Sequence, residues 1–248
     1  MARRVVAIAG GTRGIGLAIA RRFAREGAAV GVCARSPRPA GLPAAMLHVQ
    51  ADVRQRDQVE RFLGAIARRF GRLDVLVNCA GTSRWRAVEG LDGPLIEAVV
   101  RTSVLGTLWG CAAASRRLRR GGCIVNVSSL AGKRGSANNS AYCAAKFAVN
   151  GITQALAKEL GPRGIRVNAV CPVYVETAEI LAALAEPDAP PRGRQARAYL
   201  REFAKSQTAL GRLPTAAEVA DAVAFLAGPA ASAITGQCLN VDCGTLPQ

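Results

Sequence analysis

Near the start of the chain lies the stretch that decides its fold: Val5-Val6-Ala7-Ile8-Ala9-Gly10-Gly11-Thr12-Arg13-Gly14-Ile15-Gly16. Its first five residues are apolar, as in a buried strand of a parallel sheet. Residues 17–26 continue as a predicted helix, and Gly27 is a suitable residue to end it. The glycines between strand and helix permit a tight turn and a close approach of the backbone to a ligand. Because the start of a helix carries free N–H groups, this stretch predicts a site for a pyrophosphate group.

The rest of the chain alternates apolar strands with helical stretches. This alternation predicts an α/β fold with a Rossmann-type, doubly wound, seven-stranded parallel sheet flanked by helices. A chain of 248 residues can bury one such core, and no repeat or long linker divides it, so we expect a single domain over residues 1–248. The expected strands lie around residues 4–9, 29–34, 47–51, 73–78, 122–128, 165–171 and 237–241.

Three polar residues in the middle of the chain form a candidate catalytic set. Tyr142 and Lys146 are four residues apart in the predicted helix 141–160, so they share one face. An ammonium group beside a phenol favours the ionised phenol. Ser129 follows the apolar run 123–128, and its hydroxyl can polarise a carbonyl group. The set predicts a general acid/base with an electrophilic helper, although this spacing alone is more often an ordinary helix surface and a loop serine.

The glycine-rich stretch and this polar set resemble the short-chain dehydrogenase/reductase family, and further motifs extend the resemblance over nearly the whole chain. These motifs are Asp52-Val53, Asn78-Cys79-Ala80-Gly81, Arg166-Val167-Asn168-Ala169-Val170 with Pro172, and Ile234-Thr235-Gly236-Gln237. Within the family, the chain is similar to β-ketoacyl carrier-protein reductases and related ketoreductases. It implies hydride transfer between a nicotinamide cofactor and a ketone or secondary alcohol.

The resemblance also assigns roles to individual residues. Tyr142 is the implied general acid/base, Ser129 orients the substrate oxygen, and Lys146 favours the phenolate and holds the cofactor ribose. The implied cofactor-binding residues are Gly10, Thr12, Arg13, Gly14, Ile15, Gly16, Arg35, Asp52, Val53, Asn78, Ala80, Gly81, Tyr142, Lys146, Pro172, Val175 and Thr177. The substrate is expected to be a small carbonyl or alcohol compound, either anionic or bound to a carrier.

The residues after the second expected strand indicate which cofactor is used. Ala34 stands where relatives that prefer NAD carry an aspartate, and Arg35 follows it. An acidic side chain here would bind the ribose 2′-hydroxyl, whereas an arginine accommodates a 2′-phosphate. Arg35 and Arg13 can bracket that phosphate, so the sequence predicts NADP(H). An NAD-linked dehydrogenase that runs oxidatively is the alternative.

Three positions depart from the family pattern. Many relatives carry an asparagine on the helix after the fourth strand, where it holds a water that relays protons from the lysine. Ser103 stands at that place, and its hydroxyl is a shorter replacement. Val173 and Cys243 each replace a glycine of the family's motifs. The loss of the asparagine leaves open a second alternative, a catalytically weak NADP(H)-binding regulator.

Composition bears on partners and location. The net charge is +16, but the basic residues are 29 arginines and 4 lysines spread over many helices, and aromatic residues are only 4%. We therefore expect a solvated basic surface and no nucleic-acid partner. The eight cysteines show no paired metal spacing, so we expect no metal site and reduced thiols. We also expect no signal peptide, no apolar run near the roughly twenty residues of a membrane span, and a cytoplasmic location.

Two segments are expected to cover the substrate and to join subunits. Residues 178–212 resemble the family's substrate lid. A helix over 193–206 would place Arg194, Arg197 and Arg201 on one face and Leu200 and Phe203 on another. The basic face is either solvated surface, which we favour, or an attraction for an anionic substrate. Residues 234–244 resemble the last strand of the family and its flanks, which implies a two-fold interface within a homotetramer.

Overall fold

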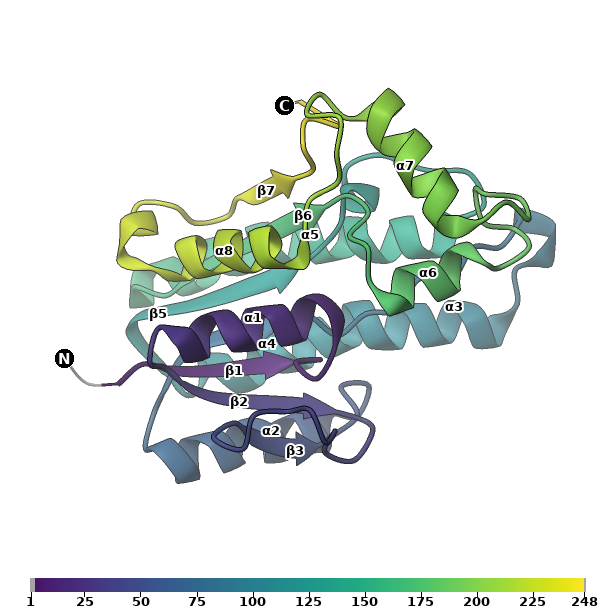
Figure 1. Cartoon of the computed structure of the whole chain (residues 1–248). Coiled ribbons are helices and arrows are strands. Elements are labelled where there is room, and N and C mark those ends of the chain that lie inside the picture. The colour runs from purple at the N-terminus through teal and green to yellow at the C-terminus, as the bar shows by residue number, and fades with distance from the viewer. Residues whose placement is uncertain (1–2, 248) are drawn as a thin grey trace.

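The computed structural model describes residues 3–247, which form one parallel sheet covered by helices on both faces (Figure 1). The strand order is β3-β2-β1-β4-β5-β6-β7, so the α/β, Rossmann-type prediction is confirmed. The strands are β1 (Val5–Ala9), β2 (Ala29–Ala34), β3 (Leu47–Gln50), β4 (Leu73–Asn78), β5 (Leu118–Val127), β6 (Arg166–Pro172) and β7 (Cys238–Val241).

The expected strands are found within about one residue, except for the start of β5. This strand begins at Leu118, four residues before the expected start at residue 122. Leu118 pairs with Leu73 of β4, and the register then shifts before Val75 pairs with Cys123. The added residues include Arg119, Arg120 and Gly121, which are exposed and do not show the apolar pattern of a buried strand.

The helices form two layers. Helices α1 and α8 pack against each other on one face of the sheet, while α2, α4 and α5 cover the other (Figure 1). The main helices are α1 (Gly14–Arg25), α2 (Arg56–Phe70), α3 (Gly93–Val100), α4 (Gly106–Ser115), α5 (Ser140–Leu160), α6 (Ala178–Leu184), α7 (Ala196–Gln207) and α8 (Ala216–Ala227).

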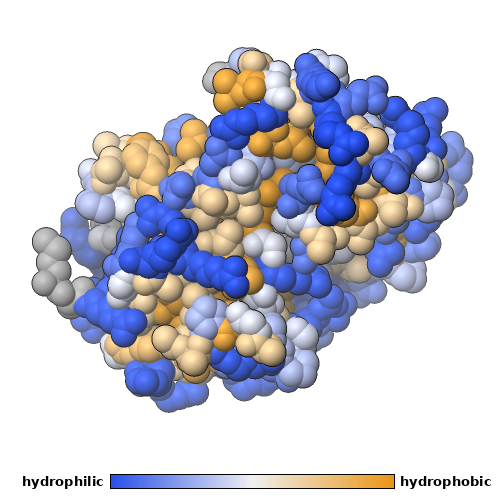
Figure 2. Space-filling view, viewed as in Figure 1, coloured by the Kyte–Doolittle hydropathy of each residue, from blue (hydrophilic) through white to orange (hydrophobic). Residues whose placement is uncertain are grey.

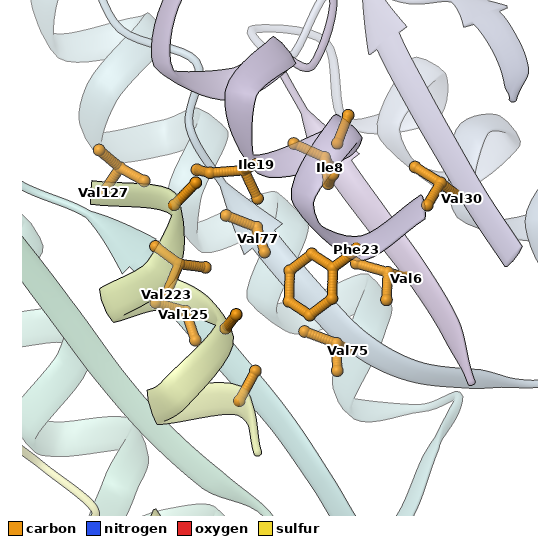
Figure 3. Close-up of a cluster of buried hydrophobic side chains, with 14 of the residues drawn as sticks. Val6, Ile8, Ile19, Phe23, Val30, Val75, Val77, Val125, Val127 and Val223 are labelled. Carbon is orange, nitrogen blue, oxygen red and sulfur yellow. The ribbon is translucent and has the colours of Figure 1, made fainter. Parts of the chain in front are cut away.

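Strand β1 shows how the two cores are divided. Its residues alternate, so Val6 and Ile8 face the core under α1 and α8, whereas Val5 and Ala7 face the other core. Phe23 of α1 is fully buried and lies among the valines of the first core (Figure 3). A strand buried on both faces needs the continuous apolar run that β1 carries.

The strand order reverses between β1 and β4, although all strands run in the same direction. From β1 the chain continues to β2 on one side, and from β4 it continues to β5 on the other, so the loops after β1 and β4 diverge at the carboxyl ends of the strands. The Cys79 N–H donates to the carbonyl of Ala9 at 2.9 Å, and the Gly10 N–H donates to the carbonyl of Cys33 at 3.0 Å. These bonds join the glycine-rich loop to the ends of β2 and β4.

A continuous helical stretch, Gly93–Ser115, is 23 residues long and contains an 18-residue window with a mean hydropathy of 1.3. It is therefore long and apolar enough to cross a membrane by length and composition, and the expectation that no apolar run approaches that length is wrong. The stretch comprises α3, a π-helical turn η2 (Arg101–Leu105) and α4. It packs on α2, α5 and β4, as a core helix of a folded domain does.

The eight cysteines are all free, which agrees with the expectation of reduced thiols. Burial raises the pKa of the Cys33 and Cys111 thiols to about 12. These thiols therefore stay protonated near neutral pH.

Two helical glycines provide a matched test of this packing. A Cβ at Gly110 in α4 would lie 2.3 Å from the Asn78 Oδ1 atom, whereas a Cβ at Gly151 in α5 meets nothing within 4 Å. We expect Gly110→Ala to lower the free energy of unfolding by about 1–3 kcal/mol, the cost of overpacking. Gly151→Ala should raise it by about 0.5–1 kcal/mol, because alanine is the better helix former. Chemical denaturation measures both changes, and equal effects of the two substitutions would contradict the packing around Asn78.

Candidate active site

Lys146 is the buried centre of the candidate active site. Only 5% of this residue is exposed, and its Nζ atom donates to the carbonyl of Val127 at 2.9 Å. The same Nζ atom lies 5.6 Å from the centre of the Tyr142 ring, one helical turn earlier on α5. The structure thus brings the predicted tyrosine and lysine onto one face of α5, with the ammonium group held below the phenol ring.

Ser129 is held beside α5 by the segment that follows β5. Its Oγ atom accepts a hydrogen bond from the Ala131 N–H at 3.1 Å and caps a short 3₁₀ helix, Leu130–Gly132. The preceding residue, Ser128, donates its hydroxyl to the carbonyl of Lys146 at 3.3 Å. A Cβ at Gly132 would lie 2.6 Å from that same carbonyl oxygen, so this close approach requires glycine.

Asn150 adds a further link that sequence reasoning missed. It lies one turn after Lys146 on α5, and its Nδ2 atom donates to the carbonyl of Gly132 at 2.8 Å. Asn150 is buried, and a buried amide requires such a partner. The signal in the sequence was a polar residue four positions after Lys146, on the helix face that Tyr142 and Lys146 share.

Ser103 lies in the π-helical turn between α3 and α4. The turn is closed by a bond from the Gly106 N–H to the carbonyl of Arg101, five residues earlier. Thr107 donates its hydroxyl to the carbonyl of Ser103 at 2.7 Å, while the Ser103 hydroxyl is 1% exposed and has no partner among the described residues. π-Helical turns are frequent at functional sites, but within the described part of the chain no hydrogen bond joins Ser103 to Lys146.

A buried chain of polar side chains underlies the end of β4. Asn78 donates its Nδ2 atom to the Oδ1 atom of Asn126 at 2.9 Å, and Asn126 donates to the hydroxyl of Thr153 at 2.9 Å. The Oδ1 atom of Asn78 has no partner among residues 3–247. Asn126 and Thr153 were not predicted, because an isolated asparagine in an apolar strand does not reveal its partner.

The glycine-rich loop has the shape that a phosphate group requires. Gly10 and Gly14 have positive φ angles of 81° and 49°, and a Cβ at Gly16 would lie 2.0 Å from the carbonyl oxygen of Gly10. The loop therefore packs tightly beneath the first turn of α1 and leaves that turn's N–H groups free for an anion. Thr12 is buried within the loop and Ile15 is half-buried. These residues fit a dinucleotide cofactor.

Arg13 does not lie free over this loop. Its Nε atom pairs with an oxygen of Glu179 in α6 at 3.1 Å. Sequence reasoning missed this carboxylate, because 166 residues separate the two side chains and no motif links them.

The end of β2 carries Arg35, which is exposed. Asp52, after β3, pairs with Arg54 at 2.6 Å, and although burial opposes ionisation, hydrogen bonds from Arg54 hold the pKa of the Asp52 carboxyl below its usual range. The charge of Arg35 acts in the same direction. Val53 is buried against Gly106, where a Cβ would lie 3.0 Å from a Val53 methyl group. Arg35 and Asp52 thus lie close enough to interact.

The remaining predicted cofactor residues lie at the carboxyl ends of β4 and β6. Ala80 packs against Gly10, and a Cβ at Gly81 would lie 3.7 Å from the Nζ atom of Lys146. Pro172 ends β6, Val175 is buried, and Thr177 caps α6 by accepting from the Ile180 N–H at 3.3 Å. The predicted cofactor residues therefore surround one edge of the sheet.

Helices α6 and α7 form a small layer with its own apolar core above this edge. Leu184 and Leu200 are buried with Trp85 from the loop after β4. Tyr174 contacts Phe203 edge-to-face at 4.9 Å between ring centres, and burial raises the pKa of the Tyr174 phenol. Hydrophilic side chains lie beside hydrophobic ones over this region in the space-filling view (Figure 2).

The arginines of this layer are arranged differently from the prediction. Helix α7 begins at Ala196, so Arg194 lies before the helix rather than on a face shared with Arg197 and Arg201. The prolines and glycine before residue 194 delay the start of the helix. Arg194 pairs with Glu202 at 2.7 Å and Arg197 with Glu176 at 2.8 Å, so the face is not an unpaired basic surface.

The comparisons agree with this arrangement. A family model described as enoyl-(acyl carrier protein) reductase matches residues 9–245. The diacetyl reductase [(S)-acetoin forming] of Staphylococcus aureus is 35% identical, over 97% of this chain and 97% of that protein. A crystal structure of a variant actinorhodin polyketide ketoreductase with NADPH is 36% identical, with a TM-score of 0.87, over 98% of this chain and 97% of that one.

A short-chain dehydrogenase from Burkholderia cenocepacia in complex with NADP is also similar. It is 34% identical with a TM-score of 0.86, and the match covers 99% of this chain and 98% of that one. Similarity of this extent reaches from the glycine-rich loop to the last strand. The chain belongs to the short-chain dehydrogenase/reductase family and is an oxidoreductase.

Proposed function

We propose that the protein is an NADP(H)-dependent ketoreductase, which interconverts a ketone and a secondary alcohol with Tyr142 as the general acid/base. The observation that carries this proposal is the buried ammonium group of Lys146, fixed on the carbonyl of Val127 and 5.6 Å from the Tyr142 ring. Burying an ammonium group costs free energy unless hydrogen bonds or an opposite charge compensate for the water it loses. The segment that holds Ser129 is bonded to the same turn of α5.

When bound, the nicotinamide cofactor supplies the hydride in the reductive direction and accepts it in the oxidative one. Tyr142 gives its phenolic proton to the substrate oxygen, and Ser129 donates a hydrogen bond that orients this oxygen. Lys146 stabilises the phenolate that remains, because an opposite charge nearby favours the ionised form. General acid/base catalysis of this kind contributes about 10²–10⁴-fold to the rate.

The preference for NADP(H) rests on the residues after β2. Ala34 offers no carboxylate to a ribose hydroxyl, and the exposed Arg35 is suited to a 2′-phosphate. The site of Lys146, Gly81 and Asn78 would hold the nicotinamide half. The NADP and NADPH found with two similar structures support this choice.

The substrate class is a small ketone or its alcohol, with an anionic or carrier-bound form included. Similar proteins are named for the reduction of diacetyl and of polyketides. The layer of α6 and α7 would act as the lid, and its aromatic side chains Tyr174, Tyr199 and Phe203 suit an apolar or aromatic substrate.

The proposed homotetramer rests on apolar side chains that are exposed on helices and on the edge strand. Ile96 of α3, Leu108 of α4 and Phe147 of α5 are 42%, 36% and 49% exposed, and Leu239 of the edge strand β7 is 40% exposed. Two such surfaces would support a homotetramer with two-fold axes.

No nucleic-acid partner is proposed, because many arginines already pair with carboxylates of the same chain, as Arg22 does with Asp221 at 2.5 Å. The free cysteines suit a reducing compartment, and we assign the protein to the cytoplasm.

The first prediction tests the proton donor. We expect Tyr142→Phe to lower kcat for a diketone with NADPH by about a hundredfold or more, because only the phenolic O–H is removed. NADPH binding, measured by fluorescence titration, and the thermal unfolding midpoint should stay near those of the wild type. A folded variant with near-normal turnover would refute the role of Tyr142.

The second prediction tests cofactor choice. Arg35→Asp should raise the Kd for NADPH by about tenfold or more, since it removes one charge-assisted contact of about 1.5–3 kcal/mol. Ala34→Asp should tighten NADH by adding a ribose acceptor. Arg61→Asp on α2 reverses the same charge outside the site and serves as the control. Equal use of NADH and NADPH by the wild type would be incompatible with a phosphate site at Arg35.

The third prediction tests assembly. Light scattering at micromolar concentration should give the mass of a tetramer. Phe147→Glu should lower that mass, because it places a charge in a proposed apolar contact. Val88→Glu, at a residue 68% exposed in the turn Val88–Gly90, should leave the mass unchanged. A monomeric wild type would rule out the proposed assembly.

A further inference from the structure

A carboxylate from the lid lies on the glycine-rich loop. One oxygen of Glu179 pairs with the Nε atom of Arg13 at 3.1 Å, and the other lies 3.0 Å from the position that a Cβ at Gly14 would take. Helix α6, which carries Glu179, lies beside the N-terminal end of α1 (Figure 1). Glu179 is half-buried, with 38% of its side chain exposed.

This place favours any anion. Gly14 is the first residue of α1, so the N–H groups of the first turn have no partner within the helix. The positive end of the helix dipole stabilises a negative charge there. Arg13 adds a full positive charge at the same point. The groups that suit the phosphates of a dinucleotide therefore also suit the carboxylate of Glu179.

We propose that Glu179 is a built-in competitor of the cofactor phosphates: it pairs with Arg13 at the start of α1 and must leave this position when the dinucleotide binds. This inference rests on the proposed NADP(H)-dependent function. Glu179 thereby weakens cofactor binding and assists cofactor release. Because α6 is part of the proposed lid, the same contact couples the position of the lid to the state of the cofactor site.

Two acidic residues at the start of the lid have different partners: Glu179 contacts the glycine-rich loop, and Glu176 does not. Thr177, which caps α6, has its methyl group 3.6 Å from the same Cβ position at Gly14, so the start of α6 rests on the loop. Glu176, three residues before Glu179, pairs instead with Arg197 of α7 at 2.8 Å. Glu176 is therefore a matched control, with the same charge on the same segment but a different partner.

The charge of Glu179 also reaches the floor of the site. Burial raises the pKa of the Cys79 thiol to about 12, the charge of Lys146 acts to lower it, and the charge of Glu179 acts to raise it. The opposite charges of Glu179 and Lys146 therefore act in opposite directions on the pKa of this thiol. The position of the carboxylate itself is given by its contacts with Arg13 and Gly14.

The competition between Glu179 and the cofactor should differ between NADH and NADPH, because only NADPH carries a 2′-phosphate. Both NADH and NADPH carry the diphosphate that would meet the start of α1, but only NADPH carries a 2′-phosphate that Arg13 can bind. While Glu179 pairs with Arg13, it neutralises part of the charge available to that phosphate. Removal of the carboxylate should therefore strengthen the binding of NADPH more than that of NADH.

The experiment measures Kd for both cofactors by fluorescence titration at low ionic strength, with the whole chain. Glu179→Gln should lower the Kd for NADPH by about two- to fivefold, the effect of one exposed charge contact, and the Kd for NADH by less. Glu179→Ala should act in the same direction. Glu176→Gln should leave both constants unchanged. Added salt should reduce the difference between Glu179→Gln and the wild type, because exposed charges are screened.

A double-mutant cycle with Arg13→Gln identifies the partner. In that background, Glu179→Gln should no longer favour NADPH over NADH, since the residue that distinguishes the two cofactors is absent. Equal Kd values for wild type and Glu179→Gln at low salt would overturn the inference while leaving the proposed function intact. If the wild type binds neither cofactor, the proposed function fails, and the inference fails with it.

Discussion

The site depends on one buried charge. The ammonium group of Lys146 is removed from water and has a single protein acceptor at hydrogen-bond distance among the described residues, the carbonyl of Val127. An ammonium group has three donors, so this bond satisfies only part of its capacity. The cost of burial is then best offset by a hydroxyl or phenolate brought to the remaining donors. The same bond fixes α5 against the end of β5, and Ser129 follows this end. One hydrogen bond therefore both holds the ammonium group near Tyr142 and keeps α5 beside Ser129.

The sequence predicted the parts of this structure that depend on local pattern. The strands, helix α5 and the glycine-rich loop follow from apolar periodicity and glycine placement, and the family motifs led to the set around Lys146. The start of β5 was missed because Arg119, Arg120 and Gly121 are exposed and show no apolar pattern. Helix α7 was predicted three residues early because the effect of the preceding Pro/Gly turn was underestimated.

Contacts between distant residues could not be predicted from one sequence. The pairing of Arg13 with Glu179 and the chain from Asn78 to Thr153 join side chains that lie far apart in the sequence and depend on how helices pack. The π-helical turn at Ser103 was also hidden, because it is a five-residue irregularity, Arg101–Leu105, within a continuous helical stretch. The lid shows a different limit: its arginines were identified, but their partners Glu202 and Glu176 decide that much of their charge is neutralised.

The buried thiols have a consequence for how this protein responds to electrophiles. Burial raises the pKa of the Cys33, Cys79 and Cys111 thiols to about 12, so these thiols are almost entirely protonated at pH 7. Alkylating reagents, which attack thiolates, should therefore modify these three residues very slowly in the folded state. Any faster modification reports a local opening of the sheet or of the loop after β4. The chain thus carries internal reporters of its own fluctuations, placed in β2, directly after β4 and in α4.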